Sequence, residues 1–318
     1  MGKKNIVWND YISQEDRFAD FFNGVVFHGD QVVFPEDLVS LDSKLWRRQP
    51  DKNSYNEYIR DTVKLWQYGD KKYILSLEPE DSPHHALPVK YMNYESVQYD
   101  RQYKESMKAH RKNRDLCSDE YLAGFSASDC LFPVVTIGIY LGEKKWSGSC
   151  RLSAITGISE KTGKISRYLA PLCNEFQVNL INIYDLETCD VFQSDLREVF
   201  GFLRLRGDKE QLRTYVEENE GFRHLQEDAF DVLSVYGTMD LKISREEYRT
   251  KEGIDMCLAL QQWEEEARAE GTARGIAAMN ELIYVMVKEG RAEELLRSSR
   301  DFNFQKKLMK EWGIQMSL

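Results

Sequence analysis

The sequence has no run of apolar residues long enough to cross a membrane. Its longest such run, Cys130–Leu141, has twelve residues with a proline inside, whereas a transmembrane helix needs about twenty. We therefore interpret this run as a buried strand. The first residues, MGKKNIVWNDYIS, contain no hydrophobic segment of a secretory signal, and Ile6 stands where the N-myristoylation pattern has Ser or Thr. We expect a cytoplasmic protein with no membrane partner.

Closely spaced cysteine pairs are also lacking. The six cysteines are isolated in the sequence, and no two have the C-x-x-C spacing of a zinc ribbon or a thioredoxin-like site. We expect reduced thiols, as is usual in a cytosolic protein.

Positive charge is scarce relative to negative charge. The chain has 43 Lys and Arg against 53 Asp and Glu, a net charge of −10. This balance disfavours a protein that coats nucleic acid generally or is held on anionic lipid. A local basic groove is compatible with this net charge, because the attraction of nucleic acid depends on where the charges lie.

What is present indicates a packed globular protein. The 318 residues are 42% hydrophobic and 12% aromatic, and at about 150 residues per domain they predict two domains. Apolar spacing in the first half predicts a helix, a strand hairpin, a long helix and two further strands. In the second half the same spacing predicts helices only. The expected helices are 15–27, 83–111, 190–206, 208–219, 222–236 and 244–290, and the expected strands are 55–66, 73–78, 132–141 and 177–185.

Acidic residues fall at one place in the predicted hairpin. Period-two alternation puts Asp61 on the face of its strand that also carries Val63, and it puts Glu78 and Glu80 on one face of the next strand. Antiparallel pairing would bring Asp61 and Glu78 together, where two carboxylates repel. Mg²⁺ removes that penalty, takes oxygen ligands, and can polarise a phosphoryl group. The alternative is that Asp61 pairs with Arg60 or Lys64 and that Glu78 is a solvated acid.

The order of motifs resembles the recombination-promoting nuclease (Rpn) family, which is also described as a transposase family and belongs to the PD-(D/E)XK nuclease superfamily. The resemblance runs through FADFFNGVVFHGDQVVFPEDLVSLD, YIRDTVK, YILSLEPEDSPHHALPVKYMNYESVQY, EYLAGFSASDCLFPVVTIGIYLGEKKWSG and QVNLINIYD, and covers most of residues 14–260. It implies a mixed central sheet flanked by helices, and a magnesium-dependent DNA endonuclease linked to recombination.

The resemblance also implies roles for individual residues. Asp61 matches the aspartate of the family's R-D-x-x-K motif, Glu78 the acid of the next strand, and Asp16 the acid of the first helix. We expect Asp61 and Glu78 to hold Mg²⁺. The family usually has glutamine two residues after the strand acid, whereas this chain reads Glu78-Pro79-Glu80. Glu80 can bind metal or act as a base there, and Pro79 removes a backbone N–H. The candidate catalytic residues are Asp61, Glu78, Glu80 and Asp16.

Basic residues supply candidate DNA contacts. Lys90 matches the family's basic position after the motif, and it either contacts phosphate or replaces a lysine that other superfamily members carry on the catalytic strand. Lys104, Lys108 and Arg111 form a cluster near the end of the same predicted helix. The alternative for all four is a solvated helix surface.

The expected architecture is therefore α/β, with a PD-(D/E)XK nuclease-like domain at 1–186 and an α-helical C-terminal region at 187–318. The expected function is hydrolysis of DNA with Mg²⁺ as cofactor. The alternative is a nuclease-derived DNA-binding or assembly protein that does not cleave. The C-terminal helices are a possible surface for a homodimer.

Overall fold

The computed structural model describes residues 2–41, 44–48, 55–59, 62–158, 163–237 and 248–314. The chain forms two compact units, Met1–Asp240 with Glu252–Ile254, and Leu241–Lys251 with Asp255–Leu318. The predicted boundary at residue 186 does not coincide with this division, because the helices that follow it pack within the first unit. None of the described helices is long and apolar enough to span a membrane.

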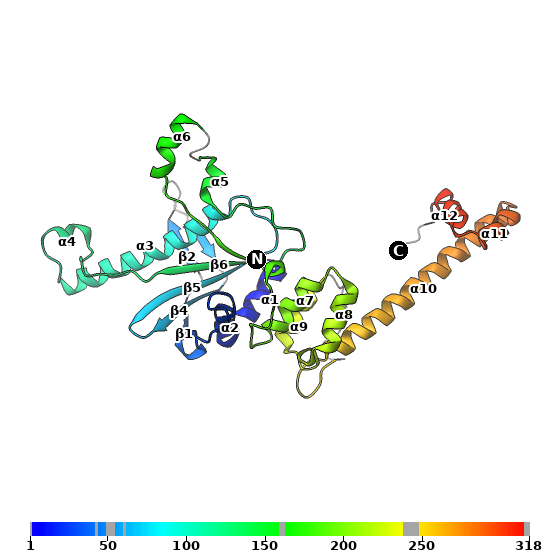
Figure 1. Ribbon diagram of the computed structural model, residues 1–318, viewed down its shortest axis with the longest axis horizontal. Helices are drawn as coiled ribbons and strands as arrows, with labels where there is room; N and C mark the ends of the chain where they lie inside the picture. Colours follow the sequence, from blue (N-terminus) through cyan, green and yellow to red (C-terminus); the bar gives the residue numbers. More distant parts are fainter. Residues whose placement is uncertain are drawn as a thin grey trace. The chain divides into compact units, whose positions relative to one another are not determined.

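A mixed five-stranded sheet forms the centre of the first unit (Figure 1). Its strand order is β1-β4-β5-β6-β7; β1, β4 and β5 pair antiparallel, whereas β5, β6 and β7 pair parallel. The two remaining strands form a separate antiparallel pair. The strands are β1 (Leu38–Ser40), β2 (Lys44–Arg48), β3 (Tyr55–Ile59), β4 (Thr62–Tyr68), β5 (Lys71–Glu80), β6 (Val134–Tyr140) and β7 (Asn179–Asn182).

The predicted hairpin is confirmed, with one correction. Tyr68 and Lys71 are the last pair of β4 and β5, and Gly69 between them has a φ of +61°, which suits a two-residue turn. The prediction of one strand over residues 55–66 is wrong, because β3 pairs with β2 in the small sheet and β4 joins the central one.

Helices lie on both faces of the central sheet. The helices of the first unit are α1 (Lys3–Ile12), α2 (Glu15–Val25), α3 (Leu87–Asn113), α4 (Ser118–Ala123), α5 (Leu152–Thr156), α6 (Lys164–Leu169), α7 (Leu196–Leu205), α8 (Lys209–Glu218) and α9 (Glu227–Tyr236). On one face, Phe18 of α2 lies under the ammonium group of Lys64 from β4. On the other face, Tyr99 of α3 packs on Val63 and Ile74. The expected arrangement of a mixed sheet between helices is therefore confirmed.

The helices after the sheet complete the same core. Trp8 of α1 stacks on Phe200 of α7, with ring centroids 6.1 Å apart, and meets Tyr236 of α9 edge-on. Phe21 of α2 also contacts Phe200. Aromatic side chains bury much apolar area, which explains why α7 and α9 belong to the first unit.

The second unit is helical, as expected of the C-terminal region. It contains α10 (Met256–Lys288), α11 (Ala292–Ser298) and α12 (Phe302–Glu311). Helix α10 begins later than the predicted residue 244: Asp255 caps it by accepting the Leu258 N–H, and Ile254 before it forms a β-bridge with Leu225.

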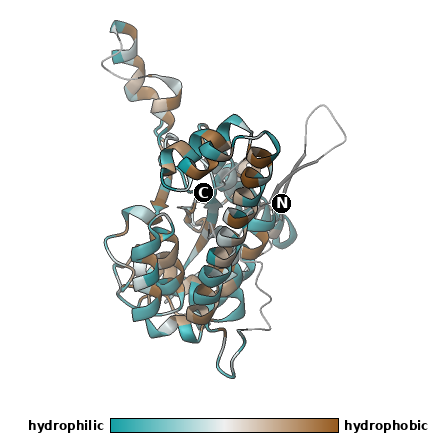
Figure 2. Cartoon of the chain, turned by 90° about the vertical axis from the view of Figure 1, so that its right-hand side faces the viewer, coloured by the Kyte–Doolittle hydropathy of each residue, from teal (hydrophilic) through white to brown (hydrophobic). Residues whose placement is uncertain are grey.

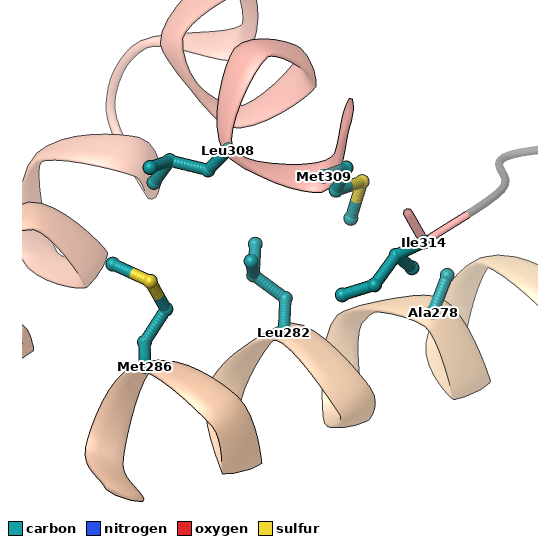
Figure 3. Close-up of a cluster of buried hydrophobic side chains, with 6 residues drawn as sticks. All are labelled: Ala278, Leu282, Met286, Leu308, Met309 and Ile314. Atoms are coloured by element: carbon teal, nitrogen blue, oxygen red, sulfur yellow. The ribbon is translucent and has the colours of Figure 1, made fainter. Parts of the chain in front are cut away.

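A small apolar core holds these helices together. Side chains from α10 and from the end of the chain point toward one another, with Leu282 at the centre (Figure 3). Its buried members are Ala278, Leu282, Met286, Leu308, Met309 and Ile314.

Candidate active site

The two acids of the Glu78-Pro79-Glu80 motif lie at the end of β5, on the sheet face that α3 covers. Ser76 pairs with Val63 on that face, and alternation along the strand places Glu78 and Glu80 on it too. The two glutamates are only 1% and 6% exposed. This excludes the alternative that Glu78 is a solvated acid. Buried carboxylates require polar partners, and these partners define the site.

Glu80 binds two residues of α3. The Lys90 ammonium group lies 2.7 Å from Oε1 of Glu80, and the Tyr91 hydroxyl donates to the same oxygen at 3.1 Å. Both donors lie in the first turns of α3, which begins with Leu87 and Pro88. Lys90 is therefore part of the acidic cluster rather than a free surface lysine.

The environment of Tyr91 keeps its hydroxyl protonated. Burial, and then the negative charges of Glu80 and Glu78, raise the pKa of Tyr91 well above its ordinary value. Tyr91 thus remains a hydrogen-bond donor to Glu80 over the physiological pH range. Gly138 of β6 makes this approach possible, because a Cβ at that position would lie 2.5 Å from the Tyr91 hydroxyl oxygen.

Glu78 has a different neighbour. The Ser76 hydroxyl donates to Oε1 of Glu78 at 3.3 Å, and Gly138 stands beside Glu78 in the parallel register of β5 and β6. Pro79 keeps that register opposite Ile139, so the proline does not displace the strand end. Ser76, Glu78 and Glu80 thus place buried oxygen atoms that can bind a metal ion on one strand.

The predicted metal ligands are described only in part. Asp61 lies outside the described residues, and the last described pair of β4 and β5 is Thr62 with Leu77. Lys64, which the sequence offers as an alternative partner for Asp61, binds Glu15 at 2.8 Å. In the part of the chain that the structure describes, no three His, Cys, Asp or Glu side chains gather as a metal centre.

The chemistry of the described donors nevertheless suits Mg²⁺. Carboxylate and hydroxyl oxygens are the hard ligands that this ion prefers, and one or two carboxylates are enough for it. Among the described residues, Glu78 would hold the ion, with its Oε1 beside the Ser76 hydroxyl group. Bound there, Mg²⁺ would polarise a phosphoryl oxygen and acidify a water molecule.

Asp16 lies apart from the two glutamates. It is exposed in the first turn of α2. Its neighbour Glu15 binds Lys64, which pairs with Leu75 and so lies on the sheet face opposite to Glu78. That hydrogen bond from Lys64 lowers the pKa of the Glu15 carboxyl group. The structure therefore places the first turn of α2 and the glutamate pair on different faces.

The basic cluster on α3 is also distant from the acids. At 1.5 Å per residue, Lys104 lies about 20 Å and Arg111 about 30 Å along the helix from Lys90. All of the cluster is exposed, and Lys104 binds Asp100 at 2.6 Å within the helix. Lys104, Lys108 and Arg111 can contact DNA only as a surface separate from the glutamate pair.

Tyr91 belongs to the site, although the sequence pattern does not indicate a polar role for it. Its helical spacing predicts a core position, and it is indeed buried with Leu87 and Val178. Only its hydroxyl end reaches Glu80. Burial of the ring and hydrogen bonding of the hydroxyl are compatible because the two ends of a tyrosine differ in polarity.

The chain matches no protein-family model, no curated protein and no solved structure among those with which it was compared.

Proposed function

We propose that this chain is a Mg²⁺-dependent DNA endonuclease. The observation that carries the proposal is the pair of buried carboxylates, Glu78 and Glu80, at the end of a central strand with the ammonium group of Lys90 beside them. Hydrolysis of a phosphodiester needs a hard cation and a positively charged group near the phosphate. The family resemblance of the sequence supports the same reaction.

Lys90 compensates for the unusual motif. The superfamily carries a lysine two residues after the strand acid, where this chain has Glu80. The ammonium group of Lys90 reaches the same place from α3, and the hydrogen bonds from Lys90 and Tyr91 hold Glu80 in turn. In our proposal Glu78 and Asp61 hold Mg²⁺, Lys90 stabilises the negative charge that develops on the phosphate, and Glu80 positions Lys90.

Plasmid nicking tests the proposal. The wild-type protein should convert supercoiled DNA to nicked circles with Mg²⁺ and not with EDTA, and Glu78→Gln should abolish the conversion. Glu105→Gln is the matched control, since Glu105 is exposed on α3 and pairs with Arg101 one turn away. Equal nicking by wild type and Glu78→Gln, or no nicking by a folded wild type over a range of DNA substrates, would overturn the proposal.

A second candidate is a nuclease-derived protein that binds DNA or assembles without cleaving. The hydrogen bonds from Lys90 and Tyr91 to one oxygen of Glu80 favour this candidate. They engage the ammonium and carboxylate groups that cleavage would use. Calorimetric titration with Mg²⁺ distinguishes the two candidates. Binding that is lost in Glu78→Ala supports the nuclease, whereas binding of duplex DNA without any Mg²⁺ uptake supports the second candidate.

A further inference from the structure

A cavity of about 610 Å³ lies between β7 with the turn after it and the segment that follows β6. Its walls include Trp146, Leu180 and Tyr184, and its polar groups include Glu143, Asn182 and Asp185. This volume is in the range of sites that bind small molecules. None of these residues belongs to the glutamate cluster, so the cavity is a separate feature of the molecule.

Strand register fixes the distance between the cavity and the acids. Glu80 stands beside Tyr140, and Tyr140 stands beside Asn182, which lines the cavity. Two strand spacings separate the backbones of Glu80 and Asn182, or about 10 Å. All three residues lie on one sheet face because they are in register. A nucleotide whose phosphate lies at Glu80 is long enough to place its base in the cavity.

The walls suit a flat aromatic ring. The Trp146 ring packs edge-on against Tyr140 at 5.0 Å between centroids, and its orientation is thereby supported. The Tyr184 hydroxyl accepts a hydrogen bond from Nε of Arg206 at 3.0 Å. Two aromatic side chains held in this way, with Leu180, offer a surface on which a base can stack.

The polar groups of the cavity are mainly acceptors. Asn182 donates to Oδ2 of Asp185 at 3.1 Å, which orients that carboxylate. Each carboxylate oxygen has two lone pairs, so both oxygens can accept from a ligand. Glu143 adds a second carboxylate, and Lys145 is the one cation among the lining residues. Two negative charges against one positive charge disfavour a phosphate in the cavity and favour a neutral ring that donates hydrogen bonds.

From this combination we infer that the cavity binds a nucleobase with adjacent N–H donors, guanine above all, of the nucleotide next to the cleaved phosphate. Guanine presents the N1–H and the N2 amino group side by side, so it can donate twice to Asp185. Uracil and thymine have only one N–H on that edge. The link to cleavage rests on the proposed function, whereas binding of the base does not.

Calorimetry with mononucleotides in EDTA tests the cavity without any cleavage. Guanosine monophosphate should bind at least about tenfold more tightly than uridine monophosphate, because it makes one more hydrogen bond to the charged Asp185. Ribose 5-phosphate should not bind, because it has no base to stack. Asp185→Asn should remove the preference for guanine. Trp146→Leu should weaken binding of both nucleotides. Asp185 is exposed, so its variant remains a valid test if Trp146→Leu fails to fold.

The outcomes separate this inference from the proposed function. Guanine-selective binding that persists in Glu78→Gln supports the cavity, whether or not the wild type nicks DNA. Equal affinities for the two nucleotides and ribose 5-phosphate overturn the inference, even if nicking is observed. Unchanged guanine selectivity in Asp185→Asn overturns the assigned role of Asp185.

Discussion

The ammonium nitrogen of Lys90 lies 2.7 Å from Oε1 of Glu80, and this ion pair joins the first turns of α3 to the end of β5. The Glu80 side chain is 7% exposed and that of Lys90 is 27% exposed, so the pair lies where a buried carboxylate meets partly accessible space. Lys90 also lies 5.7 Å and 5.8 Å from the ring centroids of Tyr91 and Tyr94, within the range of a cation–π contact.

Replacement of Lys90 should therefore reduce DNA cleavage. We expect Lys90→Met to lower the rate of plasmid nicking about 10²-fold, as loss of one charge-stabilising group does in other enzymes, and Lys90→Arg to retain part of the rate. Arg101→Met on the exposed part of α3 is the control and should leave cleavage nearly unchanged. A Lys90→Met protein that is folded and cleaves at the wild-type rate would contradict the role given to Lys90.

Gly138 should be required for the contact between Tyr91 and Glu80. A methyl group at Gly138 would lie 2.5 Å from the Tyr91 hydroxyl oxygen and 2.8 Å from Cδ1 of Leu180. We expect Gly138→Ala to lower the free energy of unfolding by about 1–3 kcal/mol through overpacking. Urea denaturation measures this change. Adding Tyr91→Phe should restore part of the loss because it removes the clashing oxygen; additive effects of the two substitutions would refute this explanation.

The buried guanidinium group of Arg17 should be a main support of the first unit. Its Nε lies 2.7 Å from Oδ1 of Asp195, and its Nη2 lies 2.9 Å from Oδ1 of Asp228, so α2 is joined to the segments that begin α7 and α9. Arg17→Ala should cost about 3–5 kcal/mol, because two poorly solvated carboxylates lose their partner. In the same urea experiment, Arg213→Ala should cost no more than about 0.5 kcal/mol, since Arg213 and Glu217 form an exposed pair. Similar losses for both variants would rule out a special role for Arg17.

His110 should titrate above its ordinary pKa of 6.5. Both ring nitrogens face carboxylates, Nδ1 at 2.7 Å from Asp115 and Nε2 at 2.8 Å from Asp129. Hydrogen bonds with Asp115 and then with Asp129 raise the pKa of His110. Its contribution to stability is therefore complete below about pH 6.5 and is lost as the pH rises through the higher pKa of the folded protein.

Nuclear magnetic resonance of the imidazole protons measures this titration. The wild-type midpoint should lie above 6.5, and Asp115→Asn should lower it more than Asp129→Asn, in the order of the two causes. A wild-type midpoint at or below 6.5 would show that the two carboxylates do not hold the imidazolium form.

A homodimer through the C-terminal helices should depend on an exposed face of α10. Ile276, Ile283, Tyr284 and Val287 are 41–67% exposed, and their spacing places them on one side of the helix. If this face joins two copies, light scattering should show a dimer for the wild type and a monomer for the double variant Ile283→Glu, Val287→Glu. Glu281→Lys, at an exposed position of the same helix outside this face, is the control. An identical mass for wild type and double variant would exclude this face as the dimer contact.

Exposed apolar residues with helical spacing also occur outside α10. Hydrophobic residues alternate with hydrophilic ones along the helices (Figure 2). On α6 and the turn after it, Ile165, Tyr168 and Leu172 are exposed with helical spacing. Such a face is typical of a helix that docks into a groove.

Local pattern accounts for much of the architecture. Period-two alternation predicts the hairpin of β4 and β5 and the common face of Glu78 and Glu80, because side chains of a strand alternate between its faces whatever surrounds it. Helical spacing likewise predicts α2, α3 and α8 to within about four residues, whereas α7 and α9 begin six and five residues later than predicted. These elements depend on interactions among neighbours in the chain, which a single sequence contains.

The remaining features depend on contacts between residues far apart in the chain. Nothing near Trp8 in the sequence indicates that it packs on Phe200 and thereby draws α7 into the first unit. The ion pair of Glu80 with Lys90 requires α3 to fold back over the sheet. The hydrogen bond from Tyr91 to Glu80 requires the space that Gly138 leaves on β6. Long-range packing selects these partners, because burial of a carboxylate is tolerated only where the assembled fold supplies donors.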